Sequence, residues 1–545
     1  MRLYHRTYPN IQWSMIILIL SVIIWGCTSP QVTQGLITAS ITVDKKDVQL
    51  KIPSGSTVQE ALKAGQIFLG EMDRVEPPLY TILSDGDLVK VTRIREEYYI
   101  EQEIIPFDHQ ELRNEAIPEG ERRLSQPGIN GLNEVTYHRV FEDDIEVSTN
   151  IIKTSVLQPA IPEIMMVGSR SSFVSVEFPG KIAFISSGNA WIIENSSGNR
   201  KLVVSTGDLD GRIFKLSPDG KLLLFSRYSN EAKSINTLWV ASLQKEPIKI
   251  FDLGVRNVVH FAEFNSNSSK VAYSTVEWRE TAPGWQANND LFELSVSVNG
   301  SVGIPNLILE SNSGGVYGWW GMDFSWSPDQ DILLYTRPDG IGKVSLSEGS
   351  MTSIYSITPY QTGGNWAWVP GASWSPEGNV IYSVDHIKTE TIGTQESHNF
   401  YLIAIPQLGG SPVRLVKDVG MFAYPVPSPM QLMKDFNYST SGKSQNQAAF
   451  SVAFLRAIFP NQSEISGYQL CTMDRDGSNQ KIIFPEEGAI GLNPQGVVWS
   501  PEPIGSEDEL AIAFVYNGNI WMVYAITGEA VQITGDRLTT RIDWR

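Results

Sequence analysis

The residues of this chain best suited to recognise a ligand are tryptophans that stand among glycines. Two glycine-rich segments, 317–321 and 363–368, carry two tryptophans each, and two more follow residue 277. Flat indole rings stack on sugar rings or fill an apolar pocket of a partner. The candidate ligand-binding residues are therefore Trp278, Trp285, Trp319, Trp320, Trp366 and Trp368. The competing interpretation is structural, with the rings filling gaps between neighbouring sheets.

Motifs for catalysis and metal binding are absent from the sequence. It has no G-x-S-x-G elbow, no sialidase-type Asp box and no P-loop. The five histidines after residue 27 are scattered, so His109 and His138 are not expected to bind zinc. Residues 474–477 read as a turn, because no glutamate follows at the spacing that calcium needs. We predict no catalytic residue, metal or cofactor.

Composition limits the class of protein. A chain of 545 residues exceeds one ordinary core, so two or more domains are expected. With 45 Gly, 30 Pro and 15 Trp, the chain has the turn-rich, aromatic-rich make-up of all-β proteins. Its net charge of −18, without any cluster of Lys or Arg, argues against nucleic acid as a partner.

A strand–turn–strand unit recurs from residue 171 onward. Its clearest copies are Leu216–Leu222, Trp326–Asp329 and Trp374–Gly378, with weaker ones near residues 180, 264, 427 and 499. Proline fixes φ in the tight turn, and the spacing of roughly 40 to 70 residues suits a four-stranded blade. This repeat resembles the TolB-like and WD-repeat-like propellers. We predict seven blades over 171–545, with Thr540–Trp544 completing the first blade. Six is the alternative, because the sixth copy is degenerate.

The N-terminus has the organisation of an export signal. Arg2 and Arg6 precede an apolar run, Met15–Trp25, which is shorter than the roughly 20 residues that span a membrane. The Gly26-Cys27 pair that follows resembles the bacterial lipobox. The resemblance implies cleavage after residue 26 and lipidation of Cys27, which anchors the protein to a membrane outside the cytoplasm. An uncleaved signal anchor is the alternative. The other cysteine, Cys471, is predicted to be a buried strand residue.

Residues 38–93, after a linker over 27–37, are predicted to form a compact module. Two alternating stretches flank residues 44–47 as in a hairpin, and Thr57 with Glu60 forms a capping-box pattern before a helix over 58–65. A closing strand over 88–91 completes a β-grasp-like fold. The module resembles the ubiquitin-like repeats of surface proteins related to resuscitation-promoting factors.

Residues 94–169 continue with long alternating stretches and almost no helix signal. Strands are predicted over 98–105, 136–140 and 145–153. Their order, and the glycines between them, resemble the G-five domain. That resemblance implies an extended sheet and an association with cell-wall polymers and N-acetylglucosamine, or with zinc-assisted adhesion.

The predicted fold is thus mostly β: a β-grasp-like module, an elongated G-five-like sheet and a propeller. We expect a lipid-anchored binding or scaffold protein outside the cytoplasm, whose propeller presents a face to a glycan, peptidoglycan or a protein partner. A binding role is favoured over an enzyme. The alternatives are a glycan-active enzyme with acids in the propeller funnel, and a structural protein of envelope assembly.

Overall fold

The computed structural model describes residues 35–545 except 115–116, 118–119, 169–174, 330–331, 388–392, 394–396, 433–447 and 506–507, so Cys27 lies outside the described residues. The chain divides into two compact units. Unit 1 runs to residue 110 and includes 124–164, and unit 2 contains 111–123 and 165–545. The prediction of a mostly β protein is confirmed.

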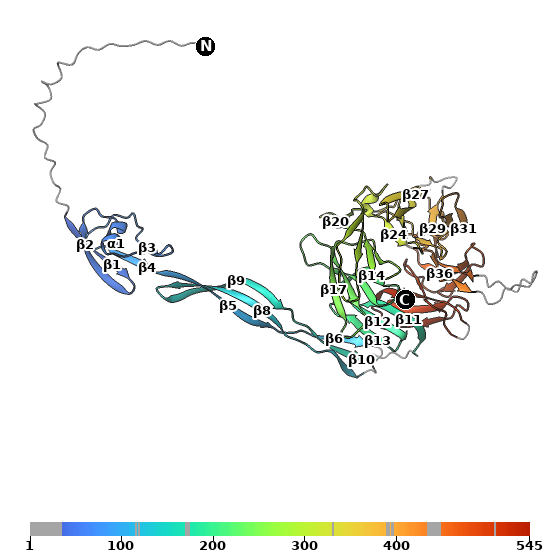
Figure 1. Ribbon diagram of the computed structural model, residues 1–545, viewed down its shortest axis with the longest axis horizontal. Coiled ribbons are helices and arrows are strands. Elements are labelled where there is room, and N and C mark those ends of the chain that lie inside the picture. The colour runs from blue at the N-terminus through green and yellow to red at the C-terminus, as the bar shows by residue number, and fades with distance from the viewer. Residues whose placement is uncertain are drawn as a thin grey trace, which may run out of the picture. The chain divides into compact units, whose positions relative to one another are not determined.

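The first module of unit 1 is a four-stranded sheet with one helix (Figure 1). A two-residue turn with positive φ at Asp44 and Lys45 joins the first two strands. Thr57 caps the helix through the predicted capping box, and the helix buries Val58, Ala61 and Leu62 against the sheet. The sheet runs β2 (Lys46–Pro53), β1 (Leu36–Val43), β4 (Leu88–Thr92), β3 (Arg74–Glu76), and the helix is α1 (Val58–Ala64).

The second module of unit 1 is built on a long three-stranded antiparallel sheet. Its strands are β5 (Ile94–Ile105), β8 (Gly131–Glu142) and β9 (Ile145–Gln158), all longer than predicted. Twelve to fourteen residues at about 3.3 Å each make strands of roughly 40 to 45 Å. Ring stacking between Tyr99 and Tyr137 and between Tyr98 and His138 links neighbouring strands, with centroids 4.9 and 4.8 Å apart.

A second three-stranded sheet follows, in the order β6 (His109–Asn114), β10 (Glu163–Gly168), β7 (Arg122–Gln126). The division between the units runs through these strands. Within unit 2, Ile117 and Met166 are buried in one cluster with Phe178, Trp544 and other apolar side chains. Residues 111–123 therefore take part in the core of unit 2.

Unit 2 contains seven four-stranded antiparallel sheets among its described residues, numbered here as sheets 1 to 7 along the chain. Sheet 1 is β13 (Arg200–Val204), β12 (Asn189–Ser196), β11 (Glu177–Ser186), β42 (Thr539–Trp544). Sheet 2 is β14 (Leu209–Leu216), β15 (Leu222–Tyr228), β16 (Asn236–Ser242), β17 (Lys249–Arg256). Sheet 3 is β18 (Ala262–Phe264), β19 (Lys270–Tyr273), β22 (Leu291–Ser295), β23 (Asn306–Leu309).

The remaining sheets repeat this order. Sheet 4 is β24 (Asp323–Trp326), β25 (Ile332–Arg337), β26 (Gly340–Ser345), β27 (Ser350–Ser356). Sheet 5 is β28 (Ala372–Trp374), β29 (Val380–His386), β30 (Phe400–Pro406), β31 (Val413–Lys417). Sheet 6 is β32 (Val426–Pro427), β35 (Ser451–Ala457), β36 (Tyr468–Asp474), β37 (Lys481–Phe484). Sheet 7 is β38 (Val498–Trp499), β39 (Ala511–Tyr516), β40 (Asn519–Tyr524), β41 (Ala530–Gln532).

Short elements interrupt the connections between these strands. They are the hairpins β20 (Val276–Trp278) with β21 (Trp285–Ala287) and β33 (Gln431–Leu432) with β34 (Ala448–Ala449), and the 3-10 turns η1 (Gly318–Trp320) and η3 (Pro460–Gln462). No helix in the described part of the chain is long and apolar enough to cross a membrane.

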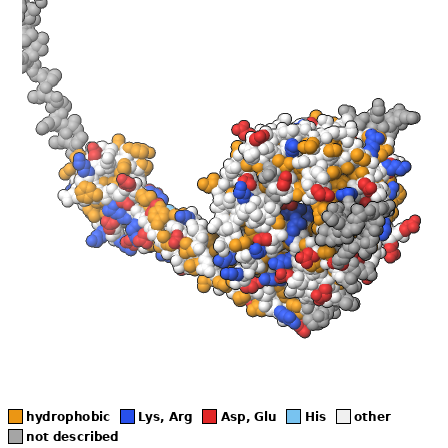
Figure 2. Space-filling model, turned by 45° about the vertical axis from the view of Figure 1, so that its right-hand side comes forward, with side chains coloured by type: hydrophobic (Ala, Val, Ile, Leu, Met, Phe, Trp, Pro, Cys, Tyr) orange, Lys and Arg blue, Asp and Glu red, His pale blue; other side chains and the backbone are white. Residues whose placement is uncertain are grey.

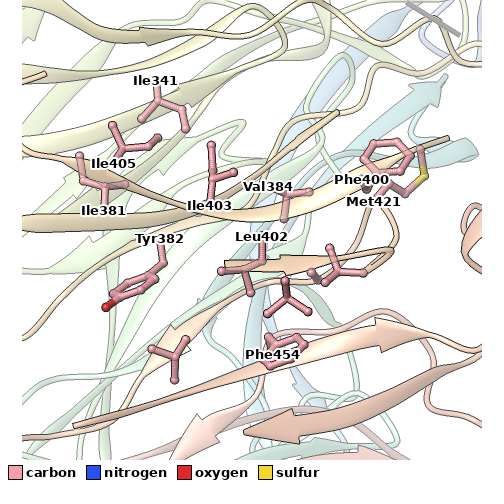
Figure 3. Close-up of a cluster of buried hydrophobic side chains, with 14 of the residues drawn as sticks. Ile341, Ile381, Tyr382, Val384, Phe400, Leu402, Ile403, Ile405, Met421 and Phe454 are labelled. Atoms are coloured by element: carbon pink, nitrogen blue, oxygen red, sulfur yellow. The ribbon is translucent and has the colours of Figure 1, made fainter. Parts of the chain in front are cut away.

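Each sheet of unit 2 shares buried side chains with the next. One cluster joins sheets 1 and 2, others join 2 with 3, 3 with 4, and 6 with 7, and a single large cluster joins 4, 5 and 6 (Figure 3). Sheet 7 shares a cluster with sheet 1, where Ala513 and Phe184 are fully buried. The C-terminus accordingly lies beside β11 (Figure 1). Cys471 is buried in β36, as predicted.

The serine of the repeated turn has a role that the sequence pattern did not reveal. Buried hydroxyls accept a hydrogen bond from the backbone N–H at the start of the next strand, as from Leu222 to Ser217 at 2.9 Å and from Ala511 to Ser500 at 3.0 Å. In sheet 3, the carboxamide oxygen of Asn265 accepts the equivalent bond from Lys270 at 3.0 Å. In these turns a backbone donor is thereby satisfied.

Candidate ligand-binding site

In unit 2, one edge strand of every sheet lies against such an edge strand of another sheet. These edge strands are β14, β18, β24, β28, β32, β38 and β42, and we call them the inner strands. β14 lies against β42 and β18, β28 lies against β24 and β32, and β38 lies against β42. Figure 2 shows a hollow in the visible face of unit 2, with Lys and Arg side chains beside it. We use the name central hollow for the space beside the inner strands, and its charged residues are those on the inner strands or next to them in the sequence.

Charged side chains of sheets that are not neighbours interact in this hollow. Lys215 on β14 of sheet 2 interacts electrostatically with Asp323 on β24 of sheet 4. Arg545, after β42 of sheet 1, interacts in the same way with Glu263 on β18 of sheet 3. Because each sheet packs on its immediate neighbours, side chains two sheets apart come close only in the space that the inner strands share.

The two carboxylates of the hollow influence each other. Protein closely surrounds Asp323 although water still reaches its side chain, and this loss of solvation raises its pKa to about 6. The negative charge of Glu263 adds to the rise, and the ammonium group of Lys215 opposes it. A backbone N–H, that of Phe324, donates to the Asp323 carboxylate at 2.9 Å.

The cationic side chains of the hollow come from sheets 1 and 2. The Nε of Arg541 donates to the carbonyl oxygen of Gly211 at 2.9 Å, so β42 and β14 hold the guanidinium at their junction. Arg212 pairs at 3.7 Å with Asp210, whose side chain is buried. Asp543 lies 4.0 Å from Arg545 and raises the pKa of that guanidinium. The side chain of Lys215 makes no hydrogen bond or ion pair with any described residue.

Tyr424 brings a third kind of group to the hollow. It precedes β32 of sheet 6 and has a φ of +41°, which is strained for a residue with a side chain. Burial, with the nearby Asp323 charge, raises the pKa of its phenol to about 12, and Arg541 opposes this. Tyr424 thus interacts with sheets 1 and 4 and remains a neutral hydrogen-bonding group over the physiological pH range.

Four of the six predicted tryptophans lie in one part of unit 2. The hairpin β20–β21 pairs Trp278 with Trp285, and the rings of Trp285 and Trp320 meet edge to face with centroids 6.2 Å apart. Trp285 is buried, Trp278 and Trp320 are half-buried, and Trp319 is 41% exposed beneath the guanidinium of Arg279. Trp319 is therefore the member of this group best placed to meet a ligand.

His260 packs against this tryptophan group. Its ring meets Trp285 edge to face with centroids 4.7 Å apart, and burial lowers the pKa of its imidazole to about 4, with help from Arg212. Its Nε2 has no hydrogen-bond partner among the described residues. The ring is therefore uncharged at neutral pH, and it lies in the sequence just before inner strand β18.

The other two predicted tryptophans lie before sheet 5. Trp368 is 1% exposed, and its indole N–H donates to the carbonyl oxygen of Met421 at 2.9 Å. Its ring packs on Tyr360, His386 and Phe400. Trp366 is half-buried beside Phe422. A structural role accounts for Trp368, and a ligand-binding role for the six residues as a set stays a prediction.

The charged residues of the hollow were not predicted as site residues. Their signal is visible in hindsight: Lys215, Glu263 and Asp323 stand within three residues of the bulky residue that ends each inner strand. A charged side chain between buried apolar residues is costly unless water or a polar partner solvates it, so its presence indicates a polar surface nearby. Acids in the propeller funnel were expected only for the alternative of a glycan-active enzyme, and no residues were predicted for them.

A separate pocket of about 480 Å³ lies along sheet 5. The Tyr355 hydroxyl donates to Asp385 at 2.6 Å, and the guanidinium of Arg414 lies over the ring of Tyr401 at 5.3 Å. The described residues hold no group of three or more His, Cys, Asp or Glu side chains that suits a metal ion. His109 instead lies 2.8 Å from Glu163.

Family comparisons identify the two modules of unit 1. Residues 96–170 match the G5 domain, and residues 40–79 match the G5-linked ubiquitin-like domain. Both resemblances inferred from the sequence are confirmed, since the matches fall on the predicted modules 94–169 and 38–93. The comparison with curated proteins finds no match.

Three solved structures that are similar to this chain cover between 15% and 76% of its length. A protein from Agrobacterium tumefaciens assigned as a TolB is 17% identical, over 57% of this chain and 90% of its own, with a TM-score of 0.31. The tricorn protease is 9% identical, over 76% of this chain and 39% of its own, with a TM-score of 0.38. The G5 domain of an IgA1 protease is 22% identical, over 15% and 94%, with a TM-score of 0.12. The seven sheets themselves, and not these similarities, define the architecture of unit 2.

Proposed function

We propose that this protein is a membrane-tethered binding protein of the bacterial cell surface, whose ligand enters the central hollow of unit 2. The observation that carries the proposal is the meeting of charged groups from sheets 1 to 4 in that hollow. Lys215, Arg541 and Asp323 are exposed and Glu263 is half-buried, so none of the four is enclosed in a core. Charged groups without a role in packing are typical of recognition sites.

In this proposal, sheets 1 to 7 are the blades of a seven-bladed propeller that β42 closes. Support comes from the antiparallel pairing of β42 with β11 and from the cluster shared by sheets 7 and 1. Closing a ring of sheets in this way leaves only short edges exposed. Inner strands brought around a single axis would hold the charged groups in fixed positions.

The location outside the cytoplasm is supported by the G5 match, since G5 domains are typical of extracellular bacterial proteins. Tethering is proposed through Cys27, on its resemblance to a lipidation site. A Cys27→Ser protein should move from the membrane fraction to the soluble fraction, because it lacks the acyl chains. Cys471→Ser, the matched control, should remain with the membranes. Equal membrane partitioning of both variants would exclude the lipid anchor.

The binding role is tested with isolated bacterial cell walls, the partner class that the resemblance to the G-five domain implies. The full chain, purified in a non-ionic detergent, should co-sediment with the walls. The double variant Lys215→Gln with Asp323→Asn should sediment at least about tenfold less. Lys249→Gln, on the outer strand of the same sheet as Lys215, is the matched control. Failure of the unaltered chain to bind walls would refute the proposed function.

The predicted tryptophan face is tested in the same assay. Trp319→Ala and Trp366→Ala should each weaken wall binding several-fold if their rings stack on a glycan. Unchanged binding of both variants would restrict recognition to the charged hollow.

A second candidate function is glycan cleavage. Two carboxyl groups, one with a raised pKa, are the groups that glycosidases use as acid and as nucleophile or base. Asp323 and Glu263 form such a pair. Release of reducing ends from cell walls by the unaltered chain, abolished in Asp323→Asn, would establish this activity. Wall binding without any release would leave the binding role alone.

A further inference from the structure

The charges in the central hollow are separated by sign. The cationic side chains, Arg212, Lys215, Arg541 and Arg545, belong to sheets 1 and 2, on β14 and β42 or just after it. The carboxylates, Glu263 and Asp323, belong to inner strands β18 and β24 of sheets 3 and 4. One side of the hollow is therefore basic and the other is acidic.

These opposite charges interact without touching. Lys215 influences Asp323, and Glu263 influences Arg545, yet no hydrogen bond or ion pair joins either pair among the described residues. No described hydrogen bond or ion pair joins the basic side to the acidic side, so a ligand that carries both charges could contact each of them at once.

Two of the cationic groups have carboxylates of their own behind them. Asp210 and Asp543 have side chains only 1% and 2% exposed, and they accept backbone and side-chain hydrogen bonds within sheets 1 and 2. They fix the guanidinium groups of Arg212 and Arg545 but do not face the hollow. Lys215 and Arg541 lack any such partner, so their charges are the ones open to a ligand.

We propose that the central hollow binds a zwitterionic ligand, one that carries a carboxylate and an ammonium group, such as the end of a peptide or the stem peptide of a cell wall. The inference rests on the proposed binding function. Lys215 and Arg541 receive the carboxylate. Asp323 and Glu263 receive the ammonium group. Tyr424, a neutral phenol between the two sides, donates to or accepts from the ligand backbone.

The probes for this proposal are four alanine peptides of equal length: free tetra-alanine, its N-acetyl form, its C-terminal amide and the doubly blocked form. The full chain in a non-ionic detergent is titrated with each peptide by calorimetry. Free tetra-alanine should bind best, and each single block should weaken binding roughly tenfold by removing one charge–charge contact.

Two variants show which side of the hollow binds the carboxylate of the peptide and which side binds its ammonium group. In Lys215→Gln, the preference for free tetra-alanine over its amide should shrink, because Arg541 alone then receives the carboxylate, while acetylation should weaken binding as before. In Asp323→Asn, the preference for the free over the acetylated peptide should shrink, because Glu263 alone then receives the ammonium group, while amidation should weaken binding as before. Lys249→Gln should behave as the unaltered chain. A folding defect would weaken all four peptides together, so this crossed pattern is specific to the proposed contacts.

The pH dependence supplies an independent readout. Asp323 has a pKa near 6, and the groups facing it are Glu263, Lys215 and Tyr424. The affinity for free tetra-alanine should fall as the pH falls through about 6, because protonation of Asp323 removes a negative charge opposite the ammonium group. In Asp323→Asn this fall should be absent.

Three results would overturn the proposal: no binding of free tetra-alanine, equal binding of all four peptides, or an unchanged preference in Lys215→Gln and Asp323→Asn. The source of the ligand is decided with cell walls stripped of stem peptides by an amidase. Loss of co-sedimentation identifies the stem peptide, and retention together with peptide binding identifies a free peptide. Walls that bind while tetra-alanine does not would refute this inference and leave the proposed function standing.

Discussion

Unit 1 and unit 2 are both built from antiparallel sheet, but different forces hold them together. Twelve of the fourteen residues in β9 are exposed, and the other two, Ser148 and Ser155, are half-buried. Even the apolar Ile151 and Val156 are 58% and 61% exposed. Strand β15 in unit 2 begins with five consecutive buried residues. The first sheet therefore depends on its backbone ladder and cross-strand pairs, and the second on burial of side chains.

This difference follows from layering. A sheet covered on both faces reads as a continuous apolar run, such as Leu222–Phe225, because every side chain meets a neighbouring sheet. The long sheet of unit 1 has cation–π and stacked pairs instead, such as Arg139 over Tyr99 at 4.1 Å. Such cross-strand pairs stabilise a long sheet that has no buried core of its own.

The largest effect is expected where the core of unit 2 meets the end of the chain. Trp544 is 1% exposed, and its indole N–H donates to the carbonyl oxygen of Pro179 at 2.8 Å. Trp544→Ala should lower the free energy of unfolding by about 3–5 kcal/mol. Chemical denaturation followed by circular dichroism measures the change. Trp319→Ala, at a 41% exposed site, should cost less than about 1 kcal/mol. Equal losses would show that β42 adds nothing to the packing.

The next effect concerns a buried ion pair between two residues that are far apart in the sequence. Arg200 and Asp536 lie 2.8 Å apart with side chains 3% and 6% exposed, and Arg200 also lies over the rings of Trp191 and Phe184. Asp536→Ala should cost about 3 kcal/mol, because it leaves a buried guanidinium without its partner.

The comparison for that variant is Glu121→Ala, which removes an exposed partner of Arg123 at 3.0 Å. It should cost less than about 1 kcal/mol, since water and salt screen such pairs. A denaturation midpoint of Asp536→Ala no lower than that of Glu121→Ala would contradict the role given to the buried pair.

Local signals in the sequence predicted local structure well. Thr57 and Glu60 form the capping box, and the turn at residues 44–47 and the terminal strand ending in Trp544 are where the patterns placed them. The first two depend on residues near one another in the chain. The third follows from the sequence repeat, because each copy of a repeat is expected to pair as the other copies do. The β strands of the G5 module were predicted too short, since exposed polar residues continue their ladders.

Contacts between distant residues were beyond the sequence. Nothing near Arg200 in the chain points to Asp536, and nothing near Lys215 points to Asp323. Which tryptophans are buried also depends on the packing of loops, so the glycine-rich context of Trp368 suggested exposure that its contact with Met421 removes. The candidate hollow therefore emerged from the structure, and the sequence predicted only the repeated strands beside which it lies.

A moderate effect is expected within unit 1, at the junction of its two modules. The Arg93 guanidinium contacts Asp44 at 2.9 Å, Asp73 and the carbonyl oxygen of Phe68, while its backbone N–H donates to Asp143. Arg93→Ala should lower the stability of unit 1 by about 1.5–3 kcal/mol, as expected for hydrogen bonds to charged groups. Hydrogen exchange of β4 and β5, measured by mass spectrometry, should rise. Arg74→Ala, an exposed neighbour, is the control.

The same junction should respond to acid. Hydrogen bonds from Gly70, Arg93 and Ile94 hold the pKa of Asp73 below its usual value, although burial opposes them. A lowered pKa in the folded state contributes stability that is present above about pH 4 and is lost as the pH falls further. Protection factors near Arg93, which correct for the intrinsic pH dependence of exchange, should therefore fall below pH 4, and Arg93→Ala should reduce that fall. An acid response independent of Arg93 would refute the assignment.

The smallest effect tests the comparison between the units most directly. Ile151 in β9 is 58% exposed, whereas Ile182 in β11 is fully buried between sheets 1 and 7. Ile151→Ala should change the free energy of unfolding by less than about 0.5 kcal/mol, and Ile182→Ala should cost about 2–5 kcal/mol. The same chemical change is thus measured in two environments. A cost for Ile151→Ala above about 2 kcal/mol would mean that another surface covers β9, and that the long sheet of unit 1 has a second layer in solution.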